Sequence, residues 1–188
     1  MDPDASNLTN NFLIAMPGMS DPAFERTVTY LCQHTPEGAL GIIVNRPSEM
    51  MLGDVLKELK IPIFDERVSG QPVYWGGPVQ PDRGFVLHAG EGEWKSTLRI
   101  NEEFCLTTSR DILEALGRGE GPSRAILALG YAGWGSGQLE QEIAQNAWLN
   151  AEATEAVLFD RPPEKRWHAA AELVGVDISQ LTLEAGHA

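Results

Sequence analysis

Basic residues are scarce in this chain. Its 188 residues include 14 Lys and Arg against 27 Asp and Glu, which gives a formal net charge of −13 and an isoelectric point near 4.6. The densest basic cluster contains only Arg161, Lys165 and Arg166. Affinity for DNA and for anionic lipid rests largely on Lys and Arg. The composition therefore argues against direct binding to nucleic acid or to a membrane surface.

Long apolar runs are also missing. The uncharged stretch at residues 125–139 is interrupted by glycines and is shorter than the roughly 20 apolar residues that a membrane helix needs. No Lys or Arg precedes Arg26, so the amino terminus lacks the positive region of a secretory signal. We expect a cytoplasmic protein without a membrane span.

Cysteine is rare, with only Cys32 and Cys105 in the chain. Both lie in apolar, strand-like runs, which is typical of buried, reduced thiols. One alternative stays open. His34 follows Cys32 by two residues, and an imidazole can activate a thiol, so Cys32 and His34 are candidates for an uncharacterised enzyme or a redox switch.

Motifs for metals, cofactors and catalysis are absent or incomplete. The four histidines are scattered, without paired C-x-x-C or H-E-x-x-H spacing. A dinucleotide pattern that begins at Gly133 continues to Gly135 but has Gln138 in place of its third glycine. No Gly-Lys pair of a phosphate-binding loop occurs. We expect no metal, no cofactor and no catalytic residue set.

The length and the periodicity predict one α+β domain. Apolar runs with strand character alternate with amphipathic segments, which is typical of a mixed sheet with helices packed on it. We expect a flexible segment at residues 1–10 and a single domain over residues 11–188. Strands are predicted at residues 11–15, 27–33, 39–45, 73–76, 84–88, 98–100, 105–107, 124–131 and 156–159.

Four helices are predicted from apolar spacing and from capping residues. The first covers residues 52–59, with Leu59 on its apolar face. The second begins at Thr108 and ends at Gly117, and the third covers residues 137–147 with Ser136 as its cap. The fourth opens at residues 162–163 and closes at Gly175, with Val174 facing inward.

Three glycine-punctuated blocks carry a family resemblance. They are FLIAMPGMSDPAFERTVTYLCQHTPEGALGIIVNRP at residues 12–47, WGGPVQPDRGFVLHAG at 75–90, and LALGYAGWGSGQLEQEIAQNAW at 127–148, with a closing Gly-His-Ala at 186–188. In this order and over nearly the whole length, the chain resembles the YqgE/AlgH family of bacterial proteins. The resemblance implies a single domain built on a branching, partly folded mixed sheet with flanking helices, in a bacterial cytoplasmic protein.

The resemblance carries over no catalytic or binding residue. Members of the family bear the label of transcriptional regulators of alginate synthesis, yet this chain contains no helix-turn-helix pair with a basic recognition face. If the protein affects transcription, we expect an indirect effect through a ligand or a protein partner.

We hypothesise a ligand pocket at the loops NRP, GGPVQPDRG and GYAGWG. Arg46 and Arg83 would supply its positive charge, although either could instead form an ion pair or brace carbonyls. His88 closes a strand and could bind a ligand or be a hydrogen-bonded structural histidine, and the third loop's glycines could serve close packing alone. The candidate ligand-binding residues are Asn45, Arg46, Gly76, Gly77, Asp82, Arg83, His88, Gly133, Trp134 and Gly135.

The first hypothesis for function is a non-catalytic regulatory protein that binds a small anionic ligand or a protein partner. The alternative is the enzyme or redox switch at Cys32 and His34. The sequence leaves the ligand, the partner and the oligomeric state open.

Overall fold

The computed structural model describes residues 7–90 and 94–185, with ten strands in one sheet. The strands are β1 Asn11–Ala15, β2 Val28–Thr35, β3 Gly38–Ile43, β4 Pro47–Met51, β5 Pro72–Trp75, β6 Val79–Ala89, β7 Thr97–Arg99, β8 Phe104–Thr107, β9 Ala125–Gly135 and β10 Trp148–Glu152. The α-helices are α1 Leu52–Glu58, α2 Glu66–Ser69, α3 Arg110–Arg118, α4 Gln138–Ala144, α5 Arg166–Glu172 and α6 Ile178–Ala185.

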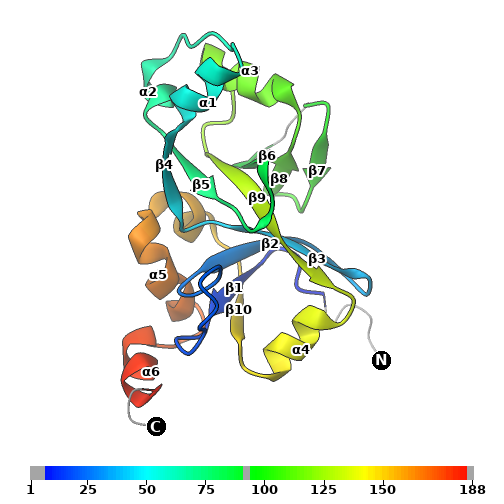
Figure 1. Ribbon diagram of the computed structural model, residues 1–188, viewed down its shortest axis with the longest axis vertical. Helices are drawn as coiled ribbons and strands as arrows, with labels where there is room; N and C mark the ends of the chain where they lie inside the picture. The colour runs from blue at the N-terminus through cyan, green and yellow to red at the C-terminus, as the bar shows by residue number, and fades with distance from the viewer. Residues whose placement is uncertain (1–6, 91–93, 186–188) are drawn as a thin grey trace.

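Strand β9 is the point at which the sheet branches (Figure 1). The main path of hydrogen-bonded strands is β10-β1-β2-β3-β9-β6-β8-β7. The first half of β9 also pairs in parallel with β5, which pairs with β4, while β3 joins the second half. The remaining pairings are antiparallel. The α+β class and the branching, mixed sheet predicted from the sequence are therefore confirmed.

Two hydrophobic cores lie on opposite faces of the sheet at β6 and β9. Successive residues of a strand point to opposite faces, and Phe85 and Leu87 belong to one core while Val86 belongs to the other. The core around Val86 contains buried residues of α1 and α3, and the core around Phe85 contains those of α5. The helices α1 and α3 therefore pack on the face of β6 that carries Val86. Phe85 lies on the opposite face.

A third cluster, rich in aromatic rings, holds α4 against β9 and β10. Trp134 and Trp148 pack edge to face with centroids 6.1 Å apart, and Phe24 contacts both rings. The two indole N–H groups donate to the same oxygen of Glu142, at 3.1 and 3.0 Å. The apolar face of α4 adds the buried Leu139.

Two predicted strands, 84–88 and 124–131, are longer in the structure: β6 begins at Val79 and β9 continues to Gly135, so most of GGPVQPDRG and all of GYAGWG, both expected as loops, are strand. The other predicted strands match within about two residues at each end, except at residues 156–159. That segment is a π-helical turn, Ala156–Asp160, because a four-residue apolar run has no period that separates strand from helix. Thr154 accepts the amide hydrogen of Val157 at its hydroxyl and that of Leu158 at its carbonyl, which starts the turn. Strands β4 and β10 were not predicted, since β4 begins at a proline and is half-exposed.

Three helix ends differ from those predicted. The cap of α3 is Ser109 rather than Thr108, and the helix passes through Gly117 to end at Gly119, whose φ of 78° is left-handed. The cap of α4 is Gly137 rather than Ser136. Residues 162–175 form a 3-10 turn, Pro163–Lys165, followed by α5, and Val174 is exposed rather than inward.

Helices α2 and α6 were not predicted, because each is short and α2 has a single buried residue, Val68. Of the amino-terminal segment expected to be flexible, residues 1–6 lie outside the described residues, as does the closing Gly-His-Ala at 186–188. Residues 7–10 are hydrogen-bonded to β2: the Leu8 amide donates to His34, and that of Asn10 donates to the Leu31 carbonyl. No helix in the described part of the chain is long and apolar enough to cross a membrane.

Candidate functional site

An apolar groove lies between α1, α3 and the branch of the sheet. Its volume is about 600 Å³. Leu127 and Leu129 of β9 form the floor, while Leu59 and Leu113 line it from the sides of α1 and α3. Large apolar cavities with a few polar groups are the usual places where proteins bind other molecules. This groove is therefore the main candidate site.

The apolar face of α1 extends beyond the part of it that the core buries. Leu52 and Leu56 are buried, whereas Leu59 is 39% exposed and lines the groove. Opposite it, Trp75 at the end of β5 is 46% exposed and lines the same groove. Contiguous exposed apolar side chains mark interaction surfaces more often than scattered ones do. The indole of Trp75 is thus a large apolar group left open to solvent.

The charged residues at the groove are mainly acidic. Glu58 and Asp82 line it, and neither carboxylate makes a hydrogen bond or ion pair with another described residue. The one lining cation, Arg110, donates to the Leu59 carbonyl at 2.8 Å and lies 3.8 Å from Glu114. The groove therefore presents uncompensated negative charge beside an apolar floor.

Asn45 and Arg46 lie away from this groove and hold a loop in place. The Arg46 guanidinium donates to the carbonyls of Ala23 and Glu25, at 2.7 Å each. The Asn45 amide accepts from the Val28 amide and donates to the carbonyl of Arg26. Both side chains thereby anchor the loop between β1 and β2.

Gly76 and Gly77 allow the end of β5 to approach β9 closely. A Cβ atom at Gly76 would lie 2.3 Å from the Gly130 carbonyl oxygen, and one at Gly77 would lie 2.1 Å from the Tyr131 carbonyl carbon. Such distances exclude any side chain. These glycines serve close backbone packing beside Trp75.

Asp82 and Arg83 point to different cavities. Asp82 and Gly84 line the apolar groove, whereas Arg83 and Phe85 line a separate cavity on the other face of β6. Arg46 lines neither of these cavities. Of the two arginines of the hypothesised pocket, Arg83 lines one of these cavities and Arg46 lines neither, so these two cavities do not bring the pair together.

His88 is buried inside the sheet. Its Nε2 lies 2.8 Å from the Thr107 hydroxyl on the neighbouring strand β8. Burial lowers the pKa of His88, and a hydrogen bond with the Ala89 carbonyl opposes this only in part. The His88 imidazole is therefore neutral, has no exposed surface and links β6 to β8 by a hydrogen bond.

The glycine segment expected as a loop is the last part of strand β9. Trp134 belongs to the aromatic cluster under α4, and the Gly135 amide donates to the Gln138 side chain at 2.9 Å. Gly133 and Trp134 line a third, shallow cavity, which adjoins the Arg83 cavity at Leu40 and Tyr131. The predicted site residues therefore do not share one pocket, although the cavities of Arg83 and Gly133 are neighbours.

Cys32 and His34 are both buried on strand β2 but face different partners. Burial raises the pKa of the Cys32 thiol well above its usual value, and its sulfur contacts the Tyr30 carbonyl at 3.8 Å. A thiol with a raised pKa holds little reactive thiolate at neutral pH. No hydrogen bond joins Cys32 to His34 within the described chain.

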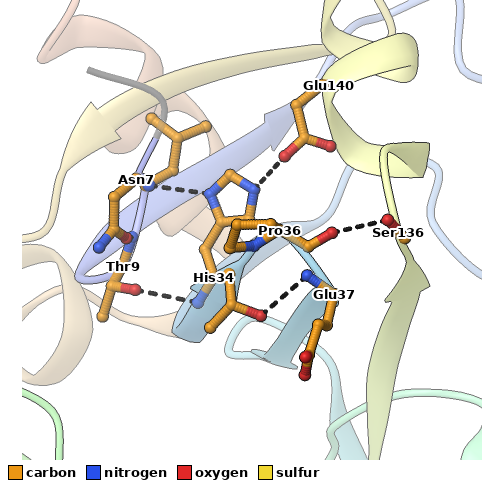
Figure 2. A network of polar contacts seen from close by, with 9 residues as sticks. Asn7, Thr9, His34, Pro36, Glu37, Ser136 and Glu140 are labelled. Carbon is orange, nitrogen blue, oxygen red and sulfur yellow. Dashed lines mark hydrogen bonds and ion pairs between the residues drawn. The ribbon is translucent and has the colours of Figure 1, made fainter. Parts of the chain in front are cut away.

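Figure 2 shows that both ring nitrogens of His34 are engaged. The Leu8 amide donates to Nδ1 at 2.9 Å, which leaves the proton of a neutral ring on Nε2, and Nε2 lies 2.5 Å from Glu140. Burial acts to raise the pKa of Glu140, but hydrogen bonds from its own amide and from His34 outweigh it, so the pKa is lowered. His34 has no free nitrogen to accept a proton from a thiol or hydroxyl.

The sequence-based prediction missed the groove residues Leu59, Trp75 and Leu113. The signal for Leu59 was present, because it lies at the end of the predicted apolar face of α1, beyond what the core covers. Trp75 precedes a glycine pair, and its exposure depends on how β5 meets β9. Among the described residues, no group of three or more His, Cys, Asp or Glu side chains is placed to hold a metal.

Fold and groove together define a single-domain α+β protein with an open apolar site on one face of a branched sheet. The AlgH-like family model matches residues 12–179, and the chain belongs to this AlgH-like family. The resemblance seen in the three glycine-punctuated blocks is thereby confirmed.

Relatives of similar length share about half of the residues. A UPF0301 protein of Methylococcus capsulatus is 59% identical over 187 residues, and one of Azoarcus is 52% identical over 188, each alignment covering 100% of both chains. The solution structure of AlgH from Pseudomonas aeruginosa matches with a TM-score of 0.80 at 49% identity, over 97% of each chain. Protein DIP2367 from Corynebacterium diphtheriae shares the fold, with a TM-score of 0.73 at 20% identity, over 93% of this chain and 91% of that one.

Proposed function

We propose that the protein is a non-catalytic regulatory protein that holds a segment of a partner protein in the apolar groove between α1 and α3. Any effect on transcription would then pass through this partner, in keeping with a net charge of −13 that opposes direct contact with DNA.

The exposure of Trp75 carries this proposal. Tryptophan is enriched among the few residues that supply most of the energy of protein interfaces. Here Trp75 is 46% exposed and lines the groove together with Leu127 and Leu129. Burial of such a ring by a partner would release its apolar surface from water.

Charge complementarity indicates the chemistry of the partner. Glu58 and Asp82 form no ion pair with a described residue, and opposite charges across an interface favour association and correct register. The occupant is therefore a segment with apolar side chains on one face and Lys or Arg beside them. An acidic segment would meet like charge at both carboxylates.

The polar side chains of the groove support binding rather than catalysis. Glu58, Asp82 and Thr108 make no side-chain hydrogen bond with one another in the described structure. General acid–base catalysis needs such groups within hydrogen-bond reach of the same reacting atom. The buried, high-pKa thiol of Cys32 and the doubly engaged His34 also favour this function over a redox switch.

Panning of a random peptide library on the folded protein tests the proposal. Enriched peptides should combine apolar or aromatic residues with Lys or Arg, and their affinity, measured by calorimetry, should fall about tenfold or more for Trp75→Ala. Phe64→Ala is the matched control, because Phe64 is 75% exposed but does not line the groove. This control should bind like the wild type.

Two results would reject the proposal. In one, selected peptides bind Trp75→Ala as tightly as they bind the wild type, or are predominantly acidic. In the other, the wild type self-associates in sedimentation experiments and Trp75→Ala does not, which would make the groove an interface between two copies of this chain.

A further inference from the structure

A second cavity lies on the face of β6 opposite the groove. It encloses about 410 Å³ and is lined by residues of β3, β6, β7, β8 and β9. Because alternate residues of a strand face opposite sides, Arg83 and Phe85 line this cavity while Asp82 and Gly84 line the groove. The two sites therefore face opposite sides of β6 and adjoin at Thr108, which lines both.

Two cations line this cavity. Arg83 forms no ion pair with a described residue, and its one polar side-chain contact is a long 3.4 Å hydrogen bond to Gln80. Lys95 lies near Asp111, whose carboxylate accepts the Lys95 amide hydrogen at 2.8 Å and interacts with the Lys95 charge. None of the described lining residues is Asp or Glu. In a chain with 27 acidic residues against 14 Lys and Arg, a lining with two cations and no described carboxylate is unusual.

The floor of the cavity is aromatic. Phe85 and Tyr131 meet edge to face with ring centroids 5.6 Å apart, and the Arg83 guanidinium lies 5.3 Å from the centroid of Phe85. Leu98, 42% exposed, lines one side. A planar ring fits against such a surface, while hydroxyls of Ser96 and Thr108 in the same lining can donate hydrogen bonds.

We infer that this cavity binds a small anion that carries a flat ring, such as an aryl phosphate or a mononucleotide. Arg83 and Lys95 contact the anionic group through charge-assisted hydrogen bonds. Tyr131 and Leu98 cover the ring, and Phe85, which is almost fully buried, supports Tyr131 and Arg83 from below. The surrounding negative charge of the protein repels longer polyanions, so the site suits a single anionic group rather than a nucleic acid strand.

Titration with phenyl phosphate, followed by backbone amide NMR shifts, tests this inference. Saturable shifts are expected at Ser96, Leu98 and Tyr131 at concentrations up to about 10 mM. Inorganic phosphate carries only the anionic group and phenol carries only the ring. Each should therefore bind at least about fivefold more weakly than phenyl phosphate. Adenosine monophosphate is the second ligand and should shift the same amides.

Variants separate a specific site from general charge effects. Arg83→Ala and Lys95→Ala should each weaken phenyl phosphate binding about tenfold. Arg99→Ala removes the same charge from the exposed surface of β7, does not line the cavity and should bind like the wild type. Trp75→Ala, in the groove, should also leave this binding unchanged, which keeps the test independent of the proposed function.

Three outcomes would overturn the inference. They are no saturable shifts for phenyl phosphate, full binding by an Arg83→Ala/Lys95→Ala double variant, or equal binding of phenyl phosphate and either fragment. Each variant's melting temperature is measured in parallel, and because Arg83 and Lys95 are exposed, we expect it to stay close to that of the wild type.

Discussion

Arg46, Arg83 and Arg166 occupy three different environments. The guanidinium of Arg46 donates to two loop carbonyls, and that of the buried Arg166 donates to the carbonyls of Arg161 and Val44 and to the Tyr74 hydroxyl. Arg83 is exposed and lies over an aromatic ring. A buried cation must be satisfied by hydrogen bonds, as Arg166 is, and Arg46 likewise stabilises the fold through its loop carbonyls. Arg83, with one long hydrogen bond to Gln80, is the most open of the three to a ligand.

At the residue scale, Cys32 gives a direct chemical test of the redox alternative. In a Cys105→Ser variant, which leaves Cys32 as the single thiol, iodoacetamide at neutral pH should alkylate Cys32 at least about 100-fold more slowly in the folded protein than in urea. The reason is burial, which blocks access and raises the pKa of the thiol. Mass spectrometry of the alkylated fraction measures both rates.

A matched variant shows whether His34 matters to this thiol. His34→Gln should leave the slow alkylation of folded Cys32 unchanged within about twofold, because no contact between the two side chains exists to be lost. Rapid alkylation of the folded wild type, slowed by His34→Gln, would instead support a Cys32–His34 pair and contradict the interpretation above.

At the scale of elements, His34 connects three segments that are distant in sequence. Its ring accepts from the Leu8 amide and contacts Glu140 at the start of α4, and its own amide donates to the Thr9 hydroxyl (Figure 2). These contacts attach residues 7–10 to β2. The His34 side chain therefore links the amino-terminal segment to the sheet and to α4 by hydrogen bonds.

The prediction at this scale concerns the amide of Leu8. In His34→Ala, hydrogen exchange at Leu8 should be about tenfold faster or more, and the free energy of unfolding should fall by about 1–3 kcal/mol, since a buried hydrogen-bond network loses its centre. Exchange measured by NMR reports this directly. Glu140→Gln is the control, because it keeps Nδ1 available to Leu8 and should preserve most of the protection of that amide.

Most elements could be predicted from periodicity, because β1, β9, α1 and α3 have clear apolar spacing and recognisable ends. The segment at 156–159 could not, since its four apolar residues fit either a strand or a helical turn and the Thr154 contacts decide between them. Parts of the candidate sites could not be predicted from the sequence either. Asp82 and Arg83 were expected in a loop, and they point to opposite faces because strand β6 extends back to Val79.

At the scale of the whole molecule, β6 separates two surfaces of different character. The groove on one side is apolar with unpaired carboxylates, and the cavity on the other is lined by aromatic rings and by the cations Arg83 and Lys95. The total charge of −13 acts on both, since it attracts basic partners and repels polyanions over distances of about a Debye length. Long-range charge therefore favours the proposed partner class before any contact forms.

The salt dependence of association measures this long-range effect. For a basic peptide selected on the groove, the association rate should fall about tenfold between about 50 and about 500 mM NaCl, while the dissociation rate changes little. Glu58→Gln combined with Asp82→Asn should reduce this salt dependence, because it removes the charges nearest the bound peptide. Glu172→Gln combined with Asp177→Asn removes the same charge beside α5, away from the groove, and should preserve most of the dependence. An equal loss in both double variants would mean that only net charge matters and that Glu58 and Asp82 do not contact the partner.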